Sequence, residues 1–455
     1  MRDSQPSGPA TAHSATRRPQ VRWFSRLPLS AAFDAGRLTS DVGLVWLDEA
    51  DQSLGICEAL AGCIPDWRRG PVVHSLPTLV RQRIFQIACG YADQNDATTL
   101  RSDPLLKAVC GRLPESGADL ASQPTLSRLE NAVDPHACEA MAEALVALYI
   151  RERQRSGAPT HLVLDIDGTD DPIHGNQEGG AYHGFYREHI YHPLLMFDGQ
   201  TDQLITAVLR PGRCHESRFV VLSLRRLLKR LRAAWPQVTI ELRADSGFAV
   251  PRLYAWCEAN GLTYTIGMIP NRRLAVIAAP LLGQALAQSK AQGGSKVRLA
   301  GETAYQARTW VHSRRVVYKA EALSKGPNTR FIVTTRGDDP LVVYDWYVGR
   351  GEAENWLKDL KNAVEADRLS DHRFWANAFR LLMHAAAYWL LDTLRTWLIQ
   401  AIGDAARMQL DTLRLRLLKI GARLRELPHT LRLHLASSHP GQSLWEALAA
   451  HRQSS

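Results

Sequence analysis

The spacing of apolar and polar positions divides the chain into regions with different expected structure. Residues 21–155 carry patterns typical of helices. Ser122-Gln123-Pro124 and Asp134-Pro135 look like helix starts, because a capping residue stands at or near a first-turn proline. Helices are predicted over Val80–Tyr91, Pro104–Cys110, Pro124–Ala132 and Pro135–Arg153. The pattern therefore predicts a helical N-terminal region. Whether Ser122–Asn131 reads DNA or only packs against its neighbours stays open.

The pattern changes at His161, where short strand-like runs begin to alternate with helices. Two of these runs are separated by Gly199-Gln200-Thr201-Asp202, which predicts a hairpin. The expected order is strands His161–Asp167, His192–Asp198 and Gln203–Arg210, helix Arg218–Trp235, strand Val238–Ala244, helix Pro251–Asn260 and strand Thr263–Ile269. This order is typical of an α/β fold with a mixed sheet.

Residues 270–340 interrupt that alternation. Segments rich in alanine and glycine lead to three runs that alternate like strands: Tyr305–Val311, Arg314–Ala320 and Arg330–Thr335. From Leu341 to Ala450 the pattern is helical and rich in leucine and alanine, and Arg407–Arg432 carries seven Lys/Arg against two Asp/Glu. We therefore expect a β-rich insertion followed by a helical C-terminal part.

Composition narrows the class of protein. A chain of 455 residues with 45% apolar residues predicts two or three domains with a large core. The formal charge of +9 favours a polyanionic partner. Seven scattered cysteines without a C-x-x-C pair argue against a disulfide framework or a zinc ribbon. No apolar run is long enough for a membrane span or typical of a signal peptide, so we expect a cytoplasmic protein without membrane contact.

Acidic residues stand where predicted strands end. Asp165 and Asp167 lie on one face at the end of the first strand of the α/β region, and Asp245 closes a later strand in the same way. Neighbouring carboxylates repel one another unless a cation neutralises them. Together with Glu354 they predict an all-oxygen site, which suits Mg²⁺ or Mn²⁺ better than zinc.

Glu354 belongs to a helix-like segment with an unusual polar face. At about 100° per residue, Tyr347, Arg350, Glu354 and Lys361 fall within an arc of roughly 60°. A solvated face with ion pairs between positions i and i+4 would give the same pattern. The arc also suits a metal site placed beside a phosphate backbone, and both interpretations stay open from the pattern alone.

These residues carry a resemblance to a known family. The spacing Tyr347-x2-Arg350-x3-Glu354-x6-Lys361 is similar to the signature of cut-and-paste DDE transposases of bacterial insertion sequences. The chain resembles insertion-sequence family thirteen-eighty over about residues 80–450. The shorter pieces that support this are Asp167-Gly168-Thr169, His174–Gly179, Leu209-Arg210-Pro211-Gly212, Arg243–Phe248, Gly90–Asp96 and Leu418–Ala422.

The resemblance implies an RNase H-like catalytic core interrupted by the β-rich insertion. Asp167, Asp245 and Glu354 would be the catalytic residues and bind two Mg²⁺ ions, for which Mn²⁺ can substitute. Asp165 competes with Asp167 as the first ligand, and Glu352 competes with Glu354.

The resemblance also implies the partners. Tyr347, Arg350 and Lys361 would contact DNA, and Trp310 or Trp346 would stack on an unpaired base, unless these are core aromatics. The expected partners are double-stranded DNA (terminal inverted repeats and target) and a second copy in a homodimeric synaptic complex. The expected location is the nucleoid of a bacterial cytoplasm.

Two alternatives remain from the sequence. Asp165-Ile166-Asp167-Gly168-Thr169 equals the first motif of haloacid-dehalogenase-like phosphatases, in which Asp165 would be the nucleophile and Asp167 the general acid. The other alternative is a nuclease-inactive, DNA-binding transposase derivative. The histidines at 174, 183, 189 and 192 fit no usual zinc spacing.

The expected domains follow from these regions. They are a disordered tail (1–20), a helical DNA-binding region (21–155), the first part of the core (156–269), the β-rich insertion (270–340), the second part of the core with the Glu354 helix (341–400) and a basic helical C-terminal region (401–455).

Overall fold

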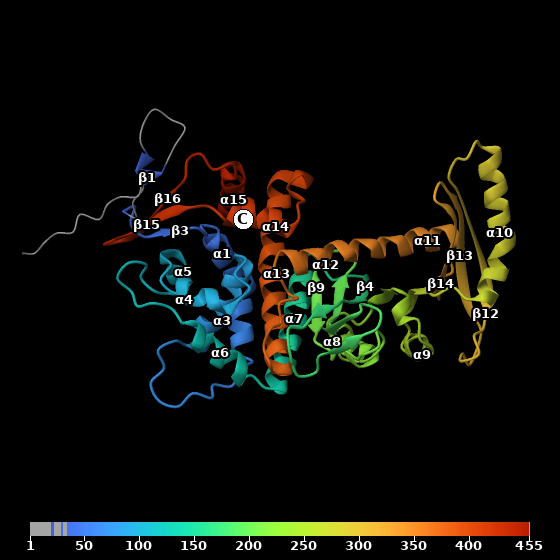
Figure 1. The fold of residues 1–455 in the computed structure, drawn as a ribbon, viewed down its shortest axis with the longest axis horizontal. Coiled ribbons are helices and arrows are strands. Elements are labelled where there is room, and N and C mark those ends of the chain that lie inside the picture. The colour runs from blue at the N-terminus through green and yellow to red at the C-terminus, as the bar shows by residue number, and fades with distance from the viewer. Residues whose placement is uncertain (1–19, 22–28, 31–33, 455) are drawn as a thin grey trace, which may run out of the picture.

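The structure is a computed structural model that describes residues 20–21, 29–30 and 34–454. The tail expected over residues 1–20 lies outside this range, apart from Gln20, which belongs to a short strand pair of β1 (Gln20–Val21) and β2 (Leu29–Ser30). Figure 1 shows three parts along the long axis of the molecule: the N-terminal helices with the C-terminal elements, a central sheet, and a far end formed by α10 (Arg272–Ala291) and the strands that follow it.

The N-terminal region is helical, as predicted. A long helix, α13 (Phe374–Ile402), runs between these helices and the central sheet (Figure 1), and every one of its residues from Ala376 to Asp392 is buried. A helix that is apolar all round belongs in a core, which is why α13 joins the two parts. The N-terminal helices are α1 (Leu44–Leu54), α2 (Ile56–Ala61), α3 (Leu76–Ala88), α4 (Ala97–Leu100), α5 (Pro104–Val109), α6 (Gln123–Ala132) and α7 (Pro135–Arg155).

The helix α6 packs within this region. Its Leu126 and Leu129 are buried, and its buried Glu130 forms ion pairs with Arg83 of α3 (3.3 Å) and Arg380 of α13 (2.5 Å). These contacts favour the packing interpretation of Ser122–Asn131 over a DNA-reading one.

The central sheet is mixed, which confirms the α/β prediction. Its strand order is β12-β13-β14-β11-β10-β4-β8-β9. The strand β4 pairs in parallel with β10, and β10 with β11, whereas β8 and β9 are antiparallel to their neighbours. The bounds are β4 (His161–Gly168), β8 (Leu194–Asp198), β9 (Leu204–Val208), β10 (Thr239–Ala244) and β11 (Thr263–Met268). The helices between them are α8 (Val220–Ala234) and α9 (Pro251–Ala259), close to their predicted bounds.

The segment 270–340 differs from the β-rich insertion that we expected. It opens with a long helix, α10 (Arg272–Ala291), before β12 (Val297–Tyr305), β13 (Arg314–Leu323) and β14 (Gly326–Thr334). The strand β14 is antiparallel to β11, so these strands continue the central sheet.

The strand predicted at Tyr305–Val311 is wrong, because β12 ends at Tyr305. The side-chain amide of Gln306 donates to the carbonyl oxygens of Trp310 (3.1 Å) and Val311 (3.2 Å), and these bonds close the segment into a turn despite its alternating pattern.

The C-terminal region is only partly helical, which corrects the prediction for residues 401–455. The strands β15 (Ala422–Leu427) and β16 (Thr430–Leu435) form a hairpin, and β15 also pairs with β3 (Leu38–Thr39). Leucine and arginine alternate with period two here, but the leucine content resembled a helix. The distant β3 supplies the second partner strand. Helix α15 (Gln442–Ser454) ends the described chain.

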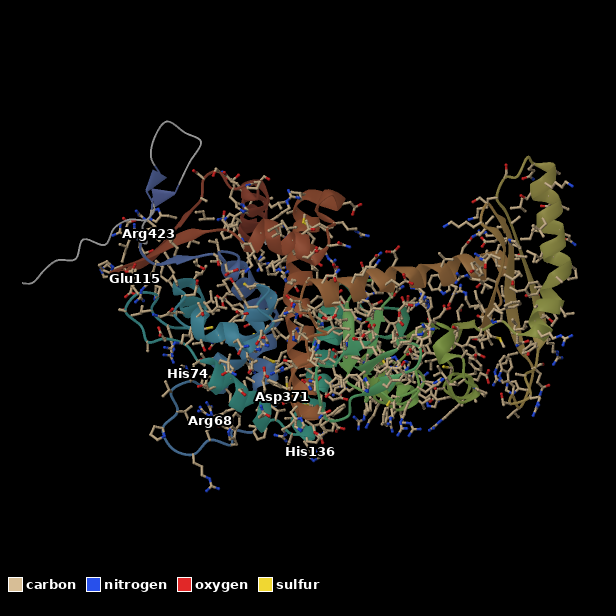
Figure 2. All side chains as sticks on the ribbon, viewed as in Figure 1. Arg68, His74, Glu115, His136, Asp371 and Arg423 are labelled. Carbon is tan, nitrogen blue, oxygen red and sulfur yellow. The ribbon has the colours of Figure 1, made fainter. Side chains whose placement is uncertain are left out.

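The hairpin is fastened to the N-terminal region. Figure 2 labels Glu115 and Arg423 at this end of the molecule. The backbone N–H of Glu115 and that of Ser116 donate to Glu426 of β15 at 3.0 and 3.1 Å.

The segment from Tyr347 to Lys361 is helical, but it is not one regular helix. The helix α11 (Pro340–Val348) passes through a 3₁₀ turn at Gly349–Glu352 into α12 (Ala353–Asn362). Figure 1 shows these pieces as one rod that crosses the central sheet from α13 to the far end. The predicted polar arc therefore lies along the sheet.

All seven cysteines are unpaired thiols, in agreement with the sequence. Within the described residues, no helix is both long and apolar enough to cross a membrane.

Candidate active site

The two predicted aspartates lie side by side at one edge of the central sheet. Ile166 of β4 is paired in parallel with Ala244 of β10, so Asp167 and Asp245 follow on adjacent strands about 5 Å apart in the pairing direction. The carboxylate of Asp245 accepts from the backbone N–H of Gly247 (2.9 Å) and caps the turn Ser246–Phe248. This capping bond orients Asp245 at the end of its strand.

Asp165 has a different environment. It is 1% exposed, and Arg243 of the neighbouring strand binds both of its oxygens, at 2.7 and 2.6 Å. The same guanidinium donates to the carbonyl oxygen of Trp346 (3.0 Å). A bidentate pair of this kind uses both carboxylate oxygens, so the structure favours Asp167 over Asp165 as a ligand.

Arg350 connects the sheet to the helical rod. Its guanidinium lies 3.3 Å from Asp167 and 3.8 Å from Glu354. Glu354 is the predicted third acid, and its side chain is 62% exposed. Glu352, the competing glutamate, accepts from the side chain of Asn355 (3.2 Å) on the exposed side of the rod. Of the two glutamates, the described ion pairs therefore connect only Glu354 to the aspartates, through Arg350.

The other members of the polar arc also face the sheet edge. Lys361 pairs with the carboxylate of Asp170 (2.9 Å) and donates to its carbonyl oxygen (2.7 Å). The hydroxyl of Tyr347 lies close to Gly267, where an added Cβ would approach it to 2.4 Å. The arc thus contacts residues at the ends of β4 and β11.

The electrostatics mark the aspartates as an unusual pair. Burial, helped by the charges of Asp245 and Glu216, raises the pKa of Asp167 to about 7 against the lowering effect of Arg350. The pKa of Asp245 is also raised, by burial first and then by Glu216. Both carboxylates are therefore destabilised as anions, which is the condition under which a bound cation stabilises them most.

Glu216 was not identified from the sequence, although it lies at this site. It follows β9, and its carboxylate lies 2.9 Å from Nε2 of His192 and 3.7 Å from Arg210. Burial raises the pKa of Glu216, but contact with His192 and Arg210 lowers it overall. The available signal was its place shortly after Leu209-Arg210-Pro211-Gly212, one of the pieces that carried the family resemblance.

The residues at the sheet edge have the donor chemistry of a magnesium or manganese site. Asp167, Asp245, Glu354 and Glu216 offer only carboxylate oxygens, and Oε2 of Glu216 is buried with no hydrogen-bond partner among the described residues. Such an orphaned oxygen beside two aspartates fits a hard cation. In the described part of the chain, however, no three His, Cys, Asp or Glu side chains are close enough to enclose a metal as they stand. The guanidinium of Arg350 lies between Asp167 and Glu354 and supplies the positive charge there.

The two tryptophans proposed for base stacking are engaged elsewhere. Trp310 is 6% exposed and packs edge-on against Tyr254 and Tyr305. The indole N–H of Trp346 donates to Glu241 (2.8 Å), and its ring lies against the guanidinium of Arg243. The structure gives both rings a packing role.

The comparison with protein families identifies the class of the chain. A family model described as "Transposase DDE domain group 1" matches residues 22–454. The chain belongs to this family of DDE transposases. This membership excludes the phosphatase alternative, whose nucleophile would be Asp165, the carboxylate held by Arg243.

Comparisons with individual proteins add less. The chain is similar to a solved structure described as a piggyBac transposase synaptic complex with hairpin DNA, with 12% identity and a TM-score of 0.42. The similarity covers 92% of this chain and 82% of that one. No curated protein sequence matches the chain.

Proposed function

We propose that this transposase catalyses metal-dependent cleavage and strand transfer at the terminal inverted repeats of an insertion sequence of family thirteen-eighty. The observation that carries the proposal is the bridge made by Arg350 between Asp167 and Glu354, with Asp245 on the adjacent strand. Through it, three acids from three separate parts of the sequence face one sheet edge.

We propose further that β4, β8, β9, β10 and β11 form an RNase H-like core. Parallel strands end at the same edge of a sheet, which is why the residues after β4 and β10 meet there. The rod of α11 and α12 then brings Glu354 to that edge from outside the five strands. Such an arrangement supplies carboxylates from rigid elements, as precise catalytic geometry requires.

Asp167, Asp245 and Glu354 are the proposed ligands of two Mg²⁺ ions. Bound there, the ions would activate an attacking oxygen and stabilise the leaving oxygen of a phosphodiester. The contribution of the chain is to orient the three carboxylates. The raised pKa of Asp167 means that its proton must leave before a cation binds.

Arg350, Lys361 and Tyr347 are the proposed DNA contacts. Arg350 and Lys361 are ion-paired with acids at the sheet edge, and a phosphate offers each of them a competing anion at the same place. A guanidinium binds phosphate through two parallel hydrogen bonds, while a lysine acts as a point charge. We expect double-stranded DNA, both inverted repeats and target, as the partner, and a homodimer in the synaptic complex.

The decisive experiment is cleavage of DNA that contains the element's end, in Mg²⁺, by the wild-type protein and by Glu354→Ala. We expect a loss of about a thousandfold, since a catalytic metal supplies several kcal/mol of transition-state stabilisation and each 1.4 kcal/mol is tenfold in rate. Glu352→Ala is the matched control, two residues away on the same rod, and should retain cleavage. Full cleavage by Glu354→Ala would refute the proposal.

A variant at Asp245 separates the remaining alternative. If the chain were a DNA-binding derivative without nuclease activity, Asp245→Ala would change neither strand cleavage nor strand transfer, because the wild type would show none. We expect instead that the wild type cleaves and that Asp245→Ala binds DNA without cleaving it.

A further inference from the structure

Glu216 fills the space between the two aspartate-bearing turns. A Cβ added to Gly168, the residue after Asp167, would lie 2.0 Å from Oε2 of Glu216. A Cβ added to Gly247, two residues after Asp245, would lie 2.5 Å from Cγ of Glu216 and 3.1 Å from the Asp245 carboxylate. Only glycine at both positions leaves room for this side chain. The backbone around the aspartates is therefore shaped to accept a third carboxylate.

Two fully buried side chains, those of His192 and Arg210, hold the other side of Glu216. Nε2 of His192 lies 2.9 Å from Oε1, and Nδ1 of the same ring lies 2.9 Å from the carbonyl oxygen of Cys214. Arg210 donates to the carbonyl oxygens of His192 (2.6 Å) and Glu216 (2.5 Å), so its guanidinium is fixed in place. These contacts give the carboxylate one orientation, with Oε1 on His192.

These contacts account for the position of Oε1 of Glu216, but they give Oε2 no hydrogen-bond donor. Oε2 is buried and accepts no hydrogen bond from any described residue, and its nearest cation, Arg210, is 3.7 Å away. It faces the Gly168 turn and adds negative charge to Asp167 and Asp245, both of which it destabilises as anions. Like charges repel, so an ion pair that served only the fold would gain nothing from placing this oxygen beside two more carboxylates.

We propose that Glu216 is a fourth carboxylate of the metal site, in which Oε2 binds a divalent cation beside Asp167 and Asp245. The inference rests on the proposed function and extends its ligand set. His192 and Arg210 are then the groups behind a metal ligand that fix its orientation, a role that outer-shell residues have at most metal sites. The cation is of the hard, oxygen-preferring class, such as Mg²⁺ or Mn²⁺.

The test is direct binding of Mn²⁺ to the full chain without DNA, by calorimetry or by electron paramagnetic resonance. We expect Glu216→Gln, which keeps the shape and removes the charge, to lower the affinity at least about tenfold. Glu258→Gln is the matched control, because Glu258 is another ion-paired glutamate, with Arg314 at 2.7 and 2.9 Å, in another part of the fold. It should leave the affinity unchanged.

Thermal unfolding separates metal binding from a purely structural role. If Glu216 only served the fold, Glu216→Gln would lower the Tm of the metal-free protein and leave the rise in Tm caused by Mn²⁺ intact. We expect instead that Mn²⁺ raises the Tm of Glu216→Gln less than it raises the Tm of the wild type. Glu216→Asp, which retains a carboxylate, should retain more of the affinity than Glu216→Gln, and it provides a second measurement if the glutamine variant folds poorly.

Asp245→Asn distinguishes failure of this inference from failure of the proposed function. Wild-type affinity in Glu216→Gln together with lost affinity in Asp245→Asn would overturn the role of Glu216 and leave the proposed function standing. Wild-type affinity in both variants would overturn both.

Discussion

Strand β4 carries two aspartates on one face, two residues apart, and each faces an arginine. In the interior of the sheet, Asp165 and Arg243 form a bidentate pair at 2.7 and 2.6 Å. At the edge of the sheet, Asp167 and Arg350 make a single contact at 3.3 Å, and Arg350 is shared with Glu354. An aspartate and an arginine thus form a closed pair in the interior, in which both carboxylate oxygens are bound. At the edge they form an open pair, with a single contact that another ion can replace.

The difference comes from the neighbours. Arg243 is the paired residue of Asp165 on the adjacent strand, so both side chains are fixed by the sheet. Arg350 comes from a 3₁₀ turn outside the sheet, and Asp167 has two further carboxylates beside it, those of Asp245 and Glu216. A closed pair stabilises the fold, while an open one is available to a cation or a phosphate.

The largest expected effect is on catalysis at the edge. Asp167→Asn should lower cleavage of end-containing DNA about a thousandfold, since it removes a metal ligand. It should not lower the Tm of the metal-free protein, because it relieves repulsion from Asp245 and Glu216. Cleavage assays and calorimetry on the same preparation measure both quantities. A large fall in Tm would show that Asp167 is structural like Asp165.

The second effect concerns the interior pair. Asp165→Asn should lower the free energy of unfolding by about 3–5 kcal/mol, because it leaves the buried charge of Arg243 without its partner. Denaturant unfolding measures this change. The fraction of Asp165→Asn that folds should cleave DNA as the wild type does. Normal stability with abolished cleavage would reverse the roles of the two aspartates.

The third effect is on the pH dependence of metal binding. Because the pKa of Asp167 is raised to about 7, Mn²⁺ must displace its proton below that pH. The apparent affinity should fall about tenfold for each pH unit below 7, the result for one proton displaced per ion. Titrations with Mn²⁺ between pH 5 and 8 measure it, and Asp167→Asn, which binds Mn²⁺ more weakly overall, should make the pH profile shallower. A flat profile in the wild type would contradict the raised pKa.

The contribution of Asp167 to folding stability changes with pH in the direction opposite to that of an ordinary salt-bridged aspartate. The pKa of Asp167 rises from 3.8 to about 7 on folding, so the folded state holds this proton more tightly. Its contribution to the stability of the metal-free protein is therefore complete below about pH 4 and is lost as the pH rises towards 7. The difference in Tm between wild type and Asp167→Asn should change in that direction.

The smallest effect is expected at Lys361, whose pair with Asp170 is partly exposed. Lys361→Ala should change the free energy of unfolding by less than about 1 kcal/mol. If Lys361 binds a phosphate, the variant should lower the slope of log Kd against log salt by about one. Lys361→Arg keeps the charge and should keep the slope. An unchanged slope in Lys361→Ala would remove Lys361 from the DNA interface.

Much of the candidate site was predictable because its signals are local. The strand that ends in Asp167, the strand that ends in Asp245 and the helical arc from Tyr347 to Lys361 are each visible in a few consecutive residues. The parallel pairing of β4 and β10 then brings the aspartates together. Local patterns gave wrong predictions where the secondary structure depends on residues that are distant in sequence. The hairpin β15–β16 depends on β3, which lies far away in sequence, and its leucines resembled a helix.

The sequence by itself determined the mixed α/β sheet, the family and the three acids of the proposed site, because strand ends and helical spacing are set by nearby residues. Only the tertiary structure decided which aspartate of β4 has the closed ion pair and which the open one, since that depends on Arg243 from the neighbouring strand and Arg350 from the rod. It also decided the place of Glu216, whose carboxylate reaches the aspartates only because Gly168 and Gly247 leave it room. Packing between segments distant in sequence, and not local propensity, controls both.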